Sequence, residues 1–306
     1  MSTISHSAIM GALIGDAFGV PFEFKPGHDI PAELEFIMPD TFRRSHGGVP
    51  YGCWSDDGSQ MLCLLETLLI NPESLDIHAF SSRLLRWFES DYHQSGGKVF
   101  DCGLATASSL RLLASGVSPM ESGQKDIRSN GNGSLMRTLP VAVVAARNGY
   151  DEDWVIKTAM LQSIPTHAHD QSLACCAVYS LLAYRMLLGK NAETKEVFGT
   201  LHEKLPAMAA ALDYVQTYGS TEIPNGTGYV INSLWSSIHC LKRANSYREA
   251  VENAVRLGND TDTTACITGG LAGIRWGIGD PEGIPEEWIF SLRVPSESNH
   301  LLSQLR

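Results

Sequence analysis

The chain has 306 residues, 43% of them hydrophobic, and a formal net charge of −11. This length is enough to bury a sizeable core, and no linker, low-complexity tract or internal repeat divides residues 1–306, so we expect a single domain. The excess of acidic side chains argues against a protein that binds the phosphate backbone, and therefore against nucleic acid as a partner.

Cysteine usage and the N-terminus indicate a cytoplasmic protein with no membrane span. The seven cysteines are odd in number, lack the paired spacing of a zinc site and fall mostly in apolar runs, which is typical of reduced core residues. The first residues lack the basic segment of a signal peptide, and Asp16 interrupts the apolar stretch that follows. The most apolar run, residues 173–188, contains Arg185 and is too short to span a membrane.

Helical periodicity dominates the chain, and we predict an all-α fold. The expected helices cover residues 8–19, 57–70, 76–92, 104–114, 138–147, 169–189, 195–217, 228–243, 246–257 and 263–276. Period-two alternation is limited to a short stretch near residues 32–37. Loops are expected at residues 25–56 and 115–134, and the first is longer than is usual for a loop without a function.

Two loops far apart in the sequence each place two carboxylates directly before an apolar helical run. These are Asp56 and Asp57 in the first loop, and Asp260 and Asp262 in the second. One carboxylate at a helix N-terminus is an ordinary cap, but four exceed what capping needs. If the fold brings the loops together, the four carboxylates repel one another unless a hard divalent cation lies between them. The alternative is two unrelated acidic caps.

Other candidate side chains lie between these loops. Glu23 stands at a helix end among aromatic residues, where a surface carboxylate is the simplest interpretation, and Asp101 could be only an N-cap. The glycine-rich residues 129–137 precede a helix and suit a phosphate, although they match neither the P-loop nor the dinucleotide fingerprint. His167 and His169 lack the spacing of two zinc ligands on one helix face.

The second acidic loop also fits another motif. Residues 260–264 match the Asp-x-Asp-x-Thr nucleophile loop of haloacid-dehalogenase-type phosphatases. That loop must follow a buried parallel strand and precede a Rossmann-like domain. Here an amphipathic helical pattern at residues 246–257 precedes it, and too few residues follow. The context therefore argues against this alternative.

Seven motifs in order resemble those of the ADP-ribosylglycohydrolase family, which includes dinitrogenase-reductase-activating glycohydrolase. They are Gly15-Asp16-Ala17-x-Gly19 with Glu23, Trp54–Asp57, Phe100-Asp101-x-Gly103, Gly131–Arg137, Thr166-His167, Gly228–Val230 and Gly258–Thr264. The similarity extends from about residue 8 to the region of Trp288. It implies an orthogonal all-α bundle with a central dinuclear metal cleft that holds two Mg²⁺ or Mn²⁺ ions.

The resemblance also implies roles for individual residues. The implied metal ligands are Ser55, Asp56, Asp57, Asp260, Asp262 and Thr263. Ser55 stands where the family usually has Thr, which keeps the hydroxyl group. An oxygen-only ligand set favours magnesium or manganese over zinc.

The implied substrate-binding and catalytic residues lie in the other motifs. Those for ADP-ribose are Gly131, Asn132, Gly133 and Ser134 for phosphate and ribose, His167 beside the ligand and Tyr229 for stacking on adenine. Asp57 or Glu23 is implied to transfer the proton in catalysis, with no preference between them. Asp101 is placed to recognise a guanidinium group by a charge-assisted hydrogen bond.

The expected reaction is metal-dependent hydrolysis of the N-glycosidic bond of ADP-ribosylated arginine on a protein. It releases ADP-ribose and reverses mono-ADP-ribosylation, and its oxocarbenium-like transition state requires a protonated leaving nitrogen. One alternative is the same chemistry on another linkage, such as serine, O-acetyl-ADP-ribose, poly-ADP-ribose or a nucleic-acid adduct. Another is a non-catalytic ADP-ribose-binding member of the fold, against which the four retained aspartates argue.

Overall fold

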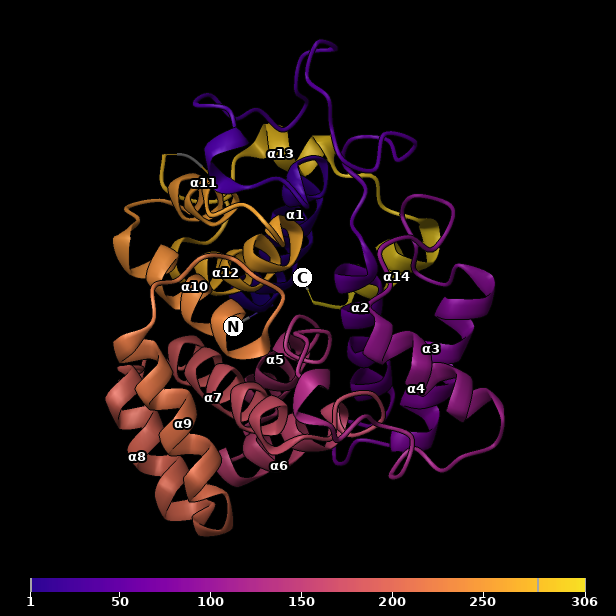
Figure 1. Cartoon of the computed structure of the whole chain (residues 1–306), viewed down its shortest axis with the longest axis vertical. Coiled ribbons are helices and arrows are strands. Elements are labelled where there is room, and N and C mark those ends of the chain that lie inside the picture. Colours follow the sequence, from indigo (N-terminus) through magenta and orange to yellow (C-terminus); the bar gives the residue numbers. More distant parts are fainter. Residues whose placement is uncertain (1, 280, 306) are drawn as a thin grey trace.

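The computed structural model of the protein is helical throughout the described residues, 2–279 and 281–305 (Figure 1). Within them lie fourteen α-helices and four short 3₁₀ helices, without a β-strand. The all-α prediction is therefore confirmed. The α-helices are α1 (Ser2–Gly19), α2 (Asp56–Ile70), α3 (Ile77–Ser90), α4 (Leu104–Ala114), α5 (Leu139–Asn148), α6 (Glu152–Ser163), α7 (Asp170–Leu187), α8 (Thr194–Lys204), α9 (Ala209–Thr221), α10 (Val230–Arg243), α11 (Tyr247–Arg256), α12 (Thr261–Trp276), α13 (Glu286–Ser291) and α14 (Ser296–Ser303).

The structure corrects several predicted elements. The helix expected over residues 195–217 is two helices, α8 and α9, because Pro206 between them lacks an N–H group and its ring disfavours a continuous helix. Helix α6 has no counterpart in the prediction, although its N-cap is readable: the Asp151 carboxylate accepts a hydrogen bond from the N–H of Trp154. Residues 32–37 form a loop rather than a strand.

Helices α1 and α12 lie side by side at the centre of the molecule (Figure 1). Their contact requires glycine, because a Cβ atom at Gly15 would lie 2.1 Å from the Ala265 carbonyl oxygen. One turn further on, a Cβ atom at Gly19 would lie 2.4 Å from the Cα of Asp262. The close approach places the C-terminal end of α1 against the N-terminal end of α12.

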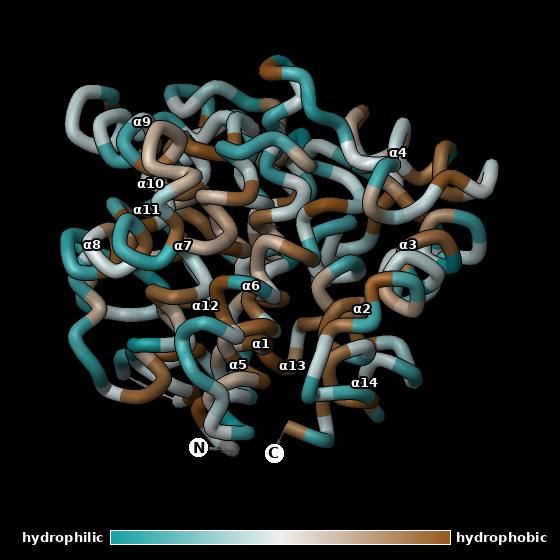
Figure 2. Tube along the Cα trace, turned by 90° about the horizontal axis from the view of Figure 1, so that it is seen from below, coloured by the Kyte–Doolittle hydropathy of each residue, from teal (hydrophilic) through white to brown (hydrophobic). Residues whose placement is uncertain are grey.

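The buried apolar side chains form one cluster around this central pair. It contains residues of α2, α5, α7, α10 and α11 in addition to α1 and α12. Figure 2 shows the same distribution along the chain trace, with hydrophobic segments gathered inside and hydrophilic segments outside. Among the described helices, none combines the length and apolar character that a membrane crossing requires.

The α1–α12 contact generates a prediction about stability. Gly15→Ala should lower the free energy of unfolding by about 1–3 kcal/mol or more, because the added methyl group meets backbone that cannot move aside. Gly199→Ala in α8 is the matched control. Its Cβ atom would meet nothing within 4 Å, so the substitution should stabilise the helix by about 0.5–1 kcal/mol. Urea denaturation measures both; equal effects of the two substitutions would contradict the glycine contact.

Candidate active site

The first acidic loop is held by a carboxylate from another helix. Asp16 of α1 is fully buried, and its two oxygens accept hydrogen bonds from the backbone N–H of Ser55 at 2.9 Å and of Gly58 at 2.8 Å. The Ser55 hydroxyl oxygen caps the same helix by accepting from the N–H of Asp57 at 3.3 Å. Asp16 therefore fixes the start of α2, a role that the sequence did not reveal.

The second acidic loop is held by the segment that follows α1. The N–H of Asn259 donates to the Lys25 carbonyl at 2.7 Å, and the N–H of Phe24 donates to the Asn259 carbonyl at the same distance. Asn259 adopts a left-handed backbone conformation, with φ of 61°, which turns the chain into α12. The start of α12 is thus tied to the residues beside Glu23.

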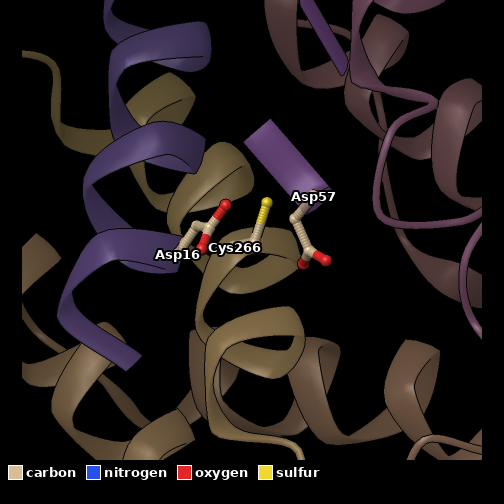
Figure 3. Close-up of side chains that lie close together, drawn as sticks. All are labelled: Asp16, Asp57 and Cys266. Atoms are coloured by element: carbon tan, nitrogen blue, oxygen red, sulfur yellow. The ribbon is translucent and has the colours of Figure 1, made fainter. Parts of the chain in front are cut away.

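The two acidic loops meet. The Thr263 hydroxyl group donates to Asp57 Oδ1 at 3.3 Å, so the interpretation of two unrelated caps is wrong. Asp57 also lies close to Asp16 and Cys266, and Figure 3 shows these three side chains converging from α2, α1 and α12.

A cavity of about 260 Å³ opens where the loops meet. Its walls include ten of the side chains and backbone positions expected from the sequence: Glu23, Asp56, Asp57, Asp101, Gly131, Asn132, Gly133, His167, Asp260 and Thr263. Four other expected residues do not line it: Ser55, Ser134, Tyr229 and Asp262. The cavity is therefore bounded by seven separate stretches of the chain.

None of the described ion pairs joins Asp56, Asp57, Asp260 or Asp262 to a basic side chain. Burial, followed by the neighbouring carboxylates, raises the pKa of Asp56, Asp57 and Asp262 well above the usual range. Burial likewise raises the pKa of Asp16 to about 7. These carboxylates therefore repel one another in a medium that solvates charge poorly.

The donor atoms at this centre fit a hard divalent cation. Asp57 Oδ2 and Asp262 Oδ2 are buried without a hydrogen-bond partner among the described residues. One carboxylate oxygen each from Glu23, Asp260 and Asp262 lie within 4.8 Å of one another. Burial raises the pKa of the nearby Cys266 thiol, which keeps it protonated and leaves oxygen atoms as the available ligands. Oxygen ligands of this kind suit Mg²⁺ and Mn²⁺.

The glycine-rich loop forms another wall of the cavity. Asn132 is anchored there because its side-chain amide donates to Asp260 Oδ2 at 2.7 Å and to the Ser233 hydroxyl at 2.9 Å. A Cβ atom at Gly133 would lie 2.9 Å from the His167 ring, so glycine is needed for this packing. Gly131 and Gly133 leave this wall of the cavity without side chains.

Ser134 and Tyr229 do not line the cavity. The Ser163 hydroxyl donates to Ser134 Oγ at 2.7 Å, and Ser134 is fully buried. The Tyr229 hydroxyl donates to Gln171 Oε1 at 3.0 Å, and its ring packs edge-on against Tyr218. The roles expected for Ser134 in ribose contact and Tyr229 in adenine stacking stay predictions.

A buried hydrogen-bond chain joins the first acidic loop to His167. Gln60 donates to Asp56 Oδ2 at 2.9 Å and accepts from Arg137 at 2.7 Å. Arg137 also donates to the Thr166 hydroxyl at 2.9 Å, and that hydroxyl contacts His167 Nδ1 at 2.9 Å. Burial lowers the pKa of His167 to about 3, so its ring is neutral.

This series of hydrogen bonds contains two residues, Gln60 and Arg137, whose roles cannot be read from the sequence. Arg137 is the last residue of a motif, but its contacts with Gln60 and Thr166 depend on the fold. The Arg137 guanidinium is fully buried and reaches Asp56 through Gln60 rather than directly.

Glu23 and Asp101 form the remaining acidic wall. Glu23 is only 3% exposed, so the interpretation as a surface carboxylate is wrong. Burial and then the carboxylates of Asp101, Asp260 and Asp57 raise the pKa of Glu23 to about 11. Burial and then Asp260 raise the pKa of Asp101 to about 6.

Asp101 is not the N-cap residue of the helix that follows it. Helix α4 begins at Leu104 with Gly103 in the N-cap position, so the capping interpretation of Asp101 is wrong. Oxygens of Asp101 and Glu23 and a ring nitrogen of His46 lie within 4.8 Å of one another. His46, in the long loop, is a further residue at the site that the sequence did not indicate.

Known proteins are similar to this chain in sequence and in fold. The family model described as ADP-ribosylglycohydrolase matches residues 5–305. ADP-ribosylarginine hydrolase Tri1 of Pseudomonas putida is 30% identical over 294 residues, which cover 93% of this chain and 73% of the relative. ADP-ribosylhydrolase ARH3 of Danio rerio is 26% identical, and the alignment covers 98% of this chain and 89% of the relative.

A solved structure shows the same fold. The structure titled "ADP-ribosylglycohydrolase-related protein complex" aligns with a TM-score of 0.76 and 28% sequence identity. The alignment covers 99% of this chain and 97% of that chain.

The raised carboxyl pKa values at the acidic centre generate a prediction about cation binding. Burial and neighbouring carboxylates raise the pKa values of Asp56, Asp57 and Asp262, and a bound cation lowers them, so binding of Mg²⁺ or Mn²⁺ should release protons. The increase in Tm on adding the cation should therefore be larger at pH 8 than at pH 6. Calorimetry in buffers of different ionisation enthalpy measures the protons released.

Two variants serve as controls for this experiment. Asp57→Asn should remove most of the cation-dependent increase in Tm, whereas Asp213→Asn, an exposed aspartate on α9, should leave it unchanged. A binding heat that does not depend on the buffer would contradict the proton release.

Proposed function

This chain belongs to the ADP-ribosylglycohydrolase family, and we propose that it is a metal-dependent hydrolase acting on ADP-ribosylated arginine. It cleaves the N-glycosidic bond between ADP-ribose and the guanidinium group of a modified protein, releases ADP-ribose and so reverses mono-ADP-ribosylation. Its partners are the ADP-ribosylated protein and ADP-ribose, and we place it in the cytoplasm.

The observation that carries the proposal is the acidic cavity at the meeting point of the two loops. Carboxylates line its floor, while Glu23 and Asp101 stand together at one wall. An arginine leaving group is cationic when protonated, and paired carboxylates recognise a guanidinium group by charge-assisted hydrogen bonds. The 30% identity to an ADP-ribosylarginine hydrolase over most of the chain supports the same acceptor.

We assign the cation ligands to the two acidic loops. They are Ser55, Asp56, Asp57, Asp260, Asp262 and Thr263, and the unpartnered buried oxygens of Asp57 and Asp262 support this assignment. Two Mg²⁺ or Mn²⁺ ions held by these residues would supply Lewis-acid chemistry.

The wall formed by the glycine-rich loop would bind the ADP-ribosyl group. Gly131, Asn132 and Gly133 let the pyrophosphate and ribose approach the backbone closely, and neutral His167 adds no charge beside them. Anchoring of Asn132 to Asp260 fixes the distance between this wall and the second acidic loop. The anomeric carbon would then be held between the two walls, and such positioning is one way in which a site accelerates cleavage.

We assign the proton transfer to Glu23 in preference to Asp57. Glu23 lines the same wall as Asp101, next to the place proposed for the leaving nitrogen. Asp57 accepts a hydrogen bond from Thr263 and belongs to the cation ligands. A carboxyl group with a raised pKa is suited to donate a proton to the leaving group at neutral pH, as cleavage of a glycosidic bond requires.

The reaction itself is the direct test. The purified protein should release ADP-ribose from a peptide that carries mono-ADP-ribosylated arginine when Mg²⁺ or Mn²⁺ is present, and chelation should stop the release. Asp260→Asn should lower the rate by about 100-fold or more, because it removes a carboxylate from the acidic centre. Faster release from serine-linked ADP-ribose, O-acetyl-ADP-ribose or poly-ADP-ribose than from the arginine-linked peptide would favour the other linkages over arginine. Binding of ADP-ribose with no release from any of these substrates would indicate a non-catalytic member.

Asp101→Ala tests the assignment of the acceptor. Loss of a carboxylate that binds a guanidinium group should lower kcat/KM for the arginine-linked peptide by about 100-fold. The affinity for free ADP-ribose, measured by calorimetry, should stay within about twofold, since the product lacks the guanidinium group. The exposed control Asp126→Ala should change neither quantity. An equal loss of ADP-ribose affinity would place Asp101 on the ADP-ribose side of the cavity instead.

A further inference from the structure

Two consecutive residues of the long loop between α1 and α2, Ser45 and His46, contact Glu23. The N–H of Ser45 donates to the Pro21 carbonyl at 2.8 Å, and the Ser45 hydroxyl donates to the carbonyl of Glu23. The next residue, His46, places its Nε2 atom 2.5 Å from Glu23 Oε2. The loop thus holds both the backbone and the side chain of Glu23.

Aromatic rings hold His46 in position. Its ring centroid lies 5.7 Å from that of Phe24 and 5.1 Å from that of Phe100, both in tilted arrangements. Phe24 follows Glu23 in the chain and Phe100 precedes Asp101, so His46 packs against both segments that supply the acidic wall. The side chain of His46 is only 16% exposed.

Several residues near Glu23 have a left-handed backbone conformation. Phe24, His46, Asp101 and Asn259 all have φ between 48° and 61°, a region that non-glycine residues rarely adopt. Each costs about 1 kcal/mol or more unless its surroundings hold it, and such residues concentrate at functional sites. At His46 the left-handed conformation is accompanied by a turn in which the N–H of Val49 donates to the His46 carbonyl at 2.8 Å.

We propose that His46 is a positioning residue, which holds one carboxyl oxygen of Glu23 so that the carboxyl group faces Asp101 and the acidic loops. His46 is not among the residues that line the cavity, so it acts through Glu23 and not on the substrate. The inference rests on the proposed function in that Glu23 takes part in bond cleavage. It also explains the long connection between α1 and α2, whose residues 45 and 46 complete the site.

Two substitutions separate the hydrogen bond of His46 from its packing. His46→Phe keeps an aromatic ring between Phe24 and Phe100 but removes the Nε2 atom. His46→Gln loses the ring but offers an amide nitrogen at a similar reach. The control is His202→Phe, which removes a histidine–carboxylate contact of 2.8 Å with Asp213 on the outside of the molecule.

Kinetics with the arginine-linked peptide give the first readout. His46→Phe should lower kcat by about 10-fold to 100-fold with KM within about twofold, because a small displacement of a catalytic group slows the chemical step without weakening binding. His46→Gln should recover kcat to within about threefold of the unsubstituted protein. A kcat for His46→Phe equal to that of the His202→Phe control would overturn the proposal, as would an equally low kcat for His46→Gln.

A crystal structure of the His46→Phe variant tests the positioning without any substrate. The Glu23 side chain should leave the orientation that it has in the unsubstituted protein, while the backbone of residues 20–24 stays in place. An unchanged Glu23 orientation would overturn the inference. If the unsubstituted protein releases no ADP-ribose from the arginine-linked peptide, the proposed function fails, and this structure still decides whether His46 positions Glu23.

Discussion

Mutual repulsion among buried carboxylates is the constraint on which the rest of this structure depends. Asp56, Asp57 and Asp262 are all buried, and Asp57 contacts the loop that carries Asp262 through Thr263. Two like charges about 4 Å apart repel by about 4 kcal/mol at the effective dielectric constant of a protein site. No described lysine or arginine pairs with them, so protons or cations must offset this repulsion. The family to which the chain belongs is one of hydrolases, and a site of this kind suits cation-dependent hydrolysis.

The fold holds these charges together by two means. The start of α2 and the start of α12 both point to the cavity, and the partial positive charge of a helix N-terminus stabilises a carboxylate placed there. Contacts of α1 are the second means. Its glycines let α12 approach closely, and the Asp16 carboxylate accepts hydrogen bonds from the start of α2. Helix α1 is therefore the common support of both acidic loops, although its own contribution to the cavity is only the segment that follows it.

Much of the fold and part of the site could be predicted from the sequence. Helices are recognisable because apolar residues recur at helical spacing, and the acidic loops because carboxylates gather before two such runs. The unpredicted features depend on contacts between distant residues. Asp16, His46 and Arg137 acquire their roles only when α1, the long loop and the glycine-rich loop come together. Asp16 and Arg137 stand in recognisable motifs, but no local pattern shows which residues they contact. Ser134 and Tyr229 also stand in recognisable motifs; neither lines the cavity, and their side chains bond to Ser163 and Gln171.

The rim of the cavity bears on the kind of substrate that fits. Phe24 is 70% exposed and Leu104 is 89% exposed, and both line the entrance beside Glu23 and Asp101. A free nucleotide would occupy the polar interior and leave this rim in water, whereas a modified side chain reaches the interior while its own protein rests on the rim. The apolar rim lies next to Glu23 and Asp101, the two carboxylates proposed to bind a guanidinium group. With the substrate proposed above, the exposure of Phe24 and Leu104 and the burial of Glu23 would suit ADP-ribose inside the cavity and the modified protein at its rim.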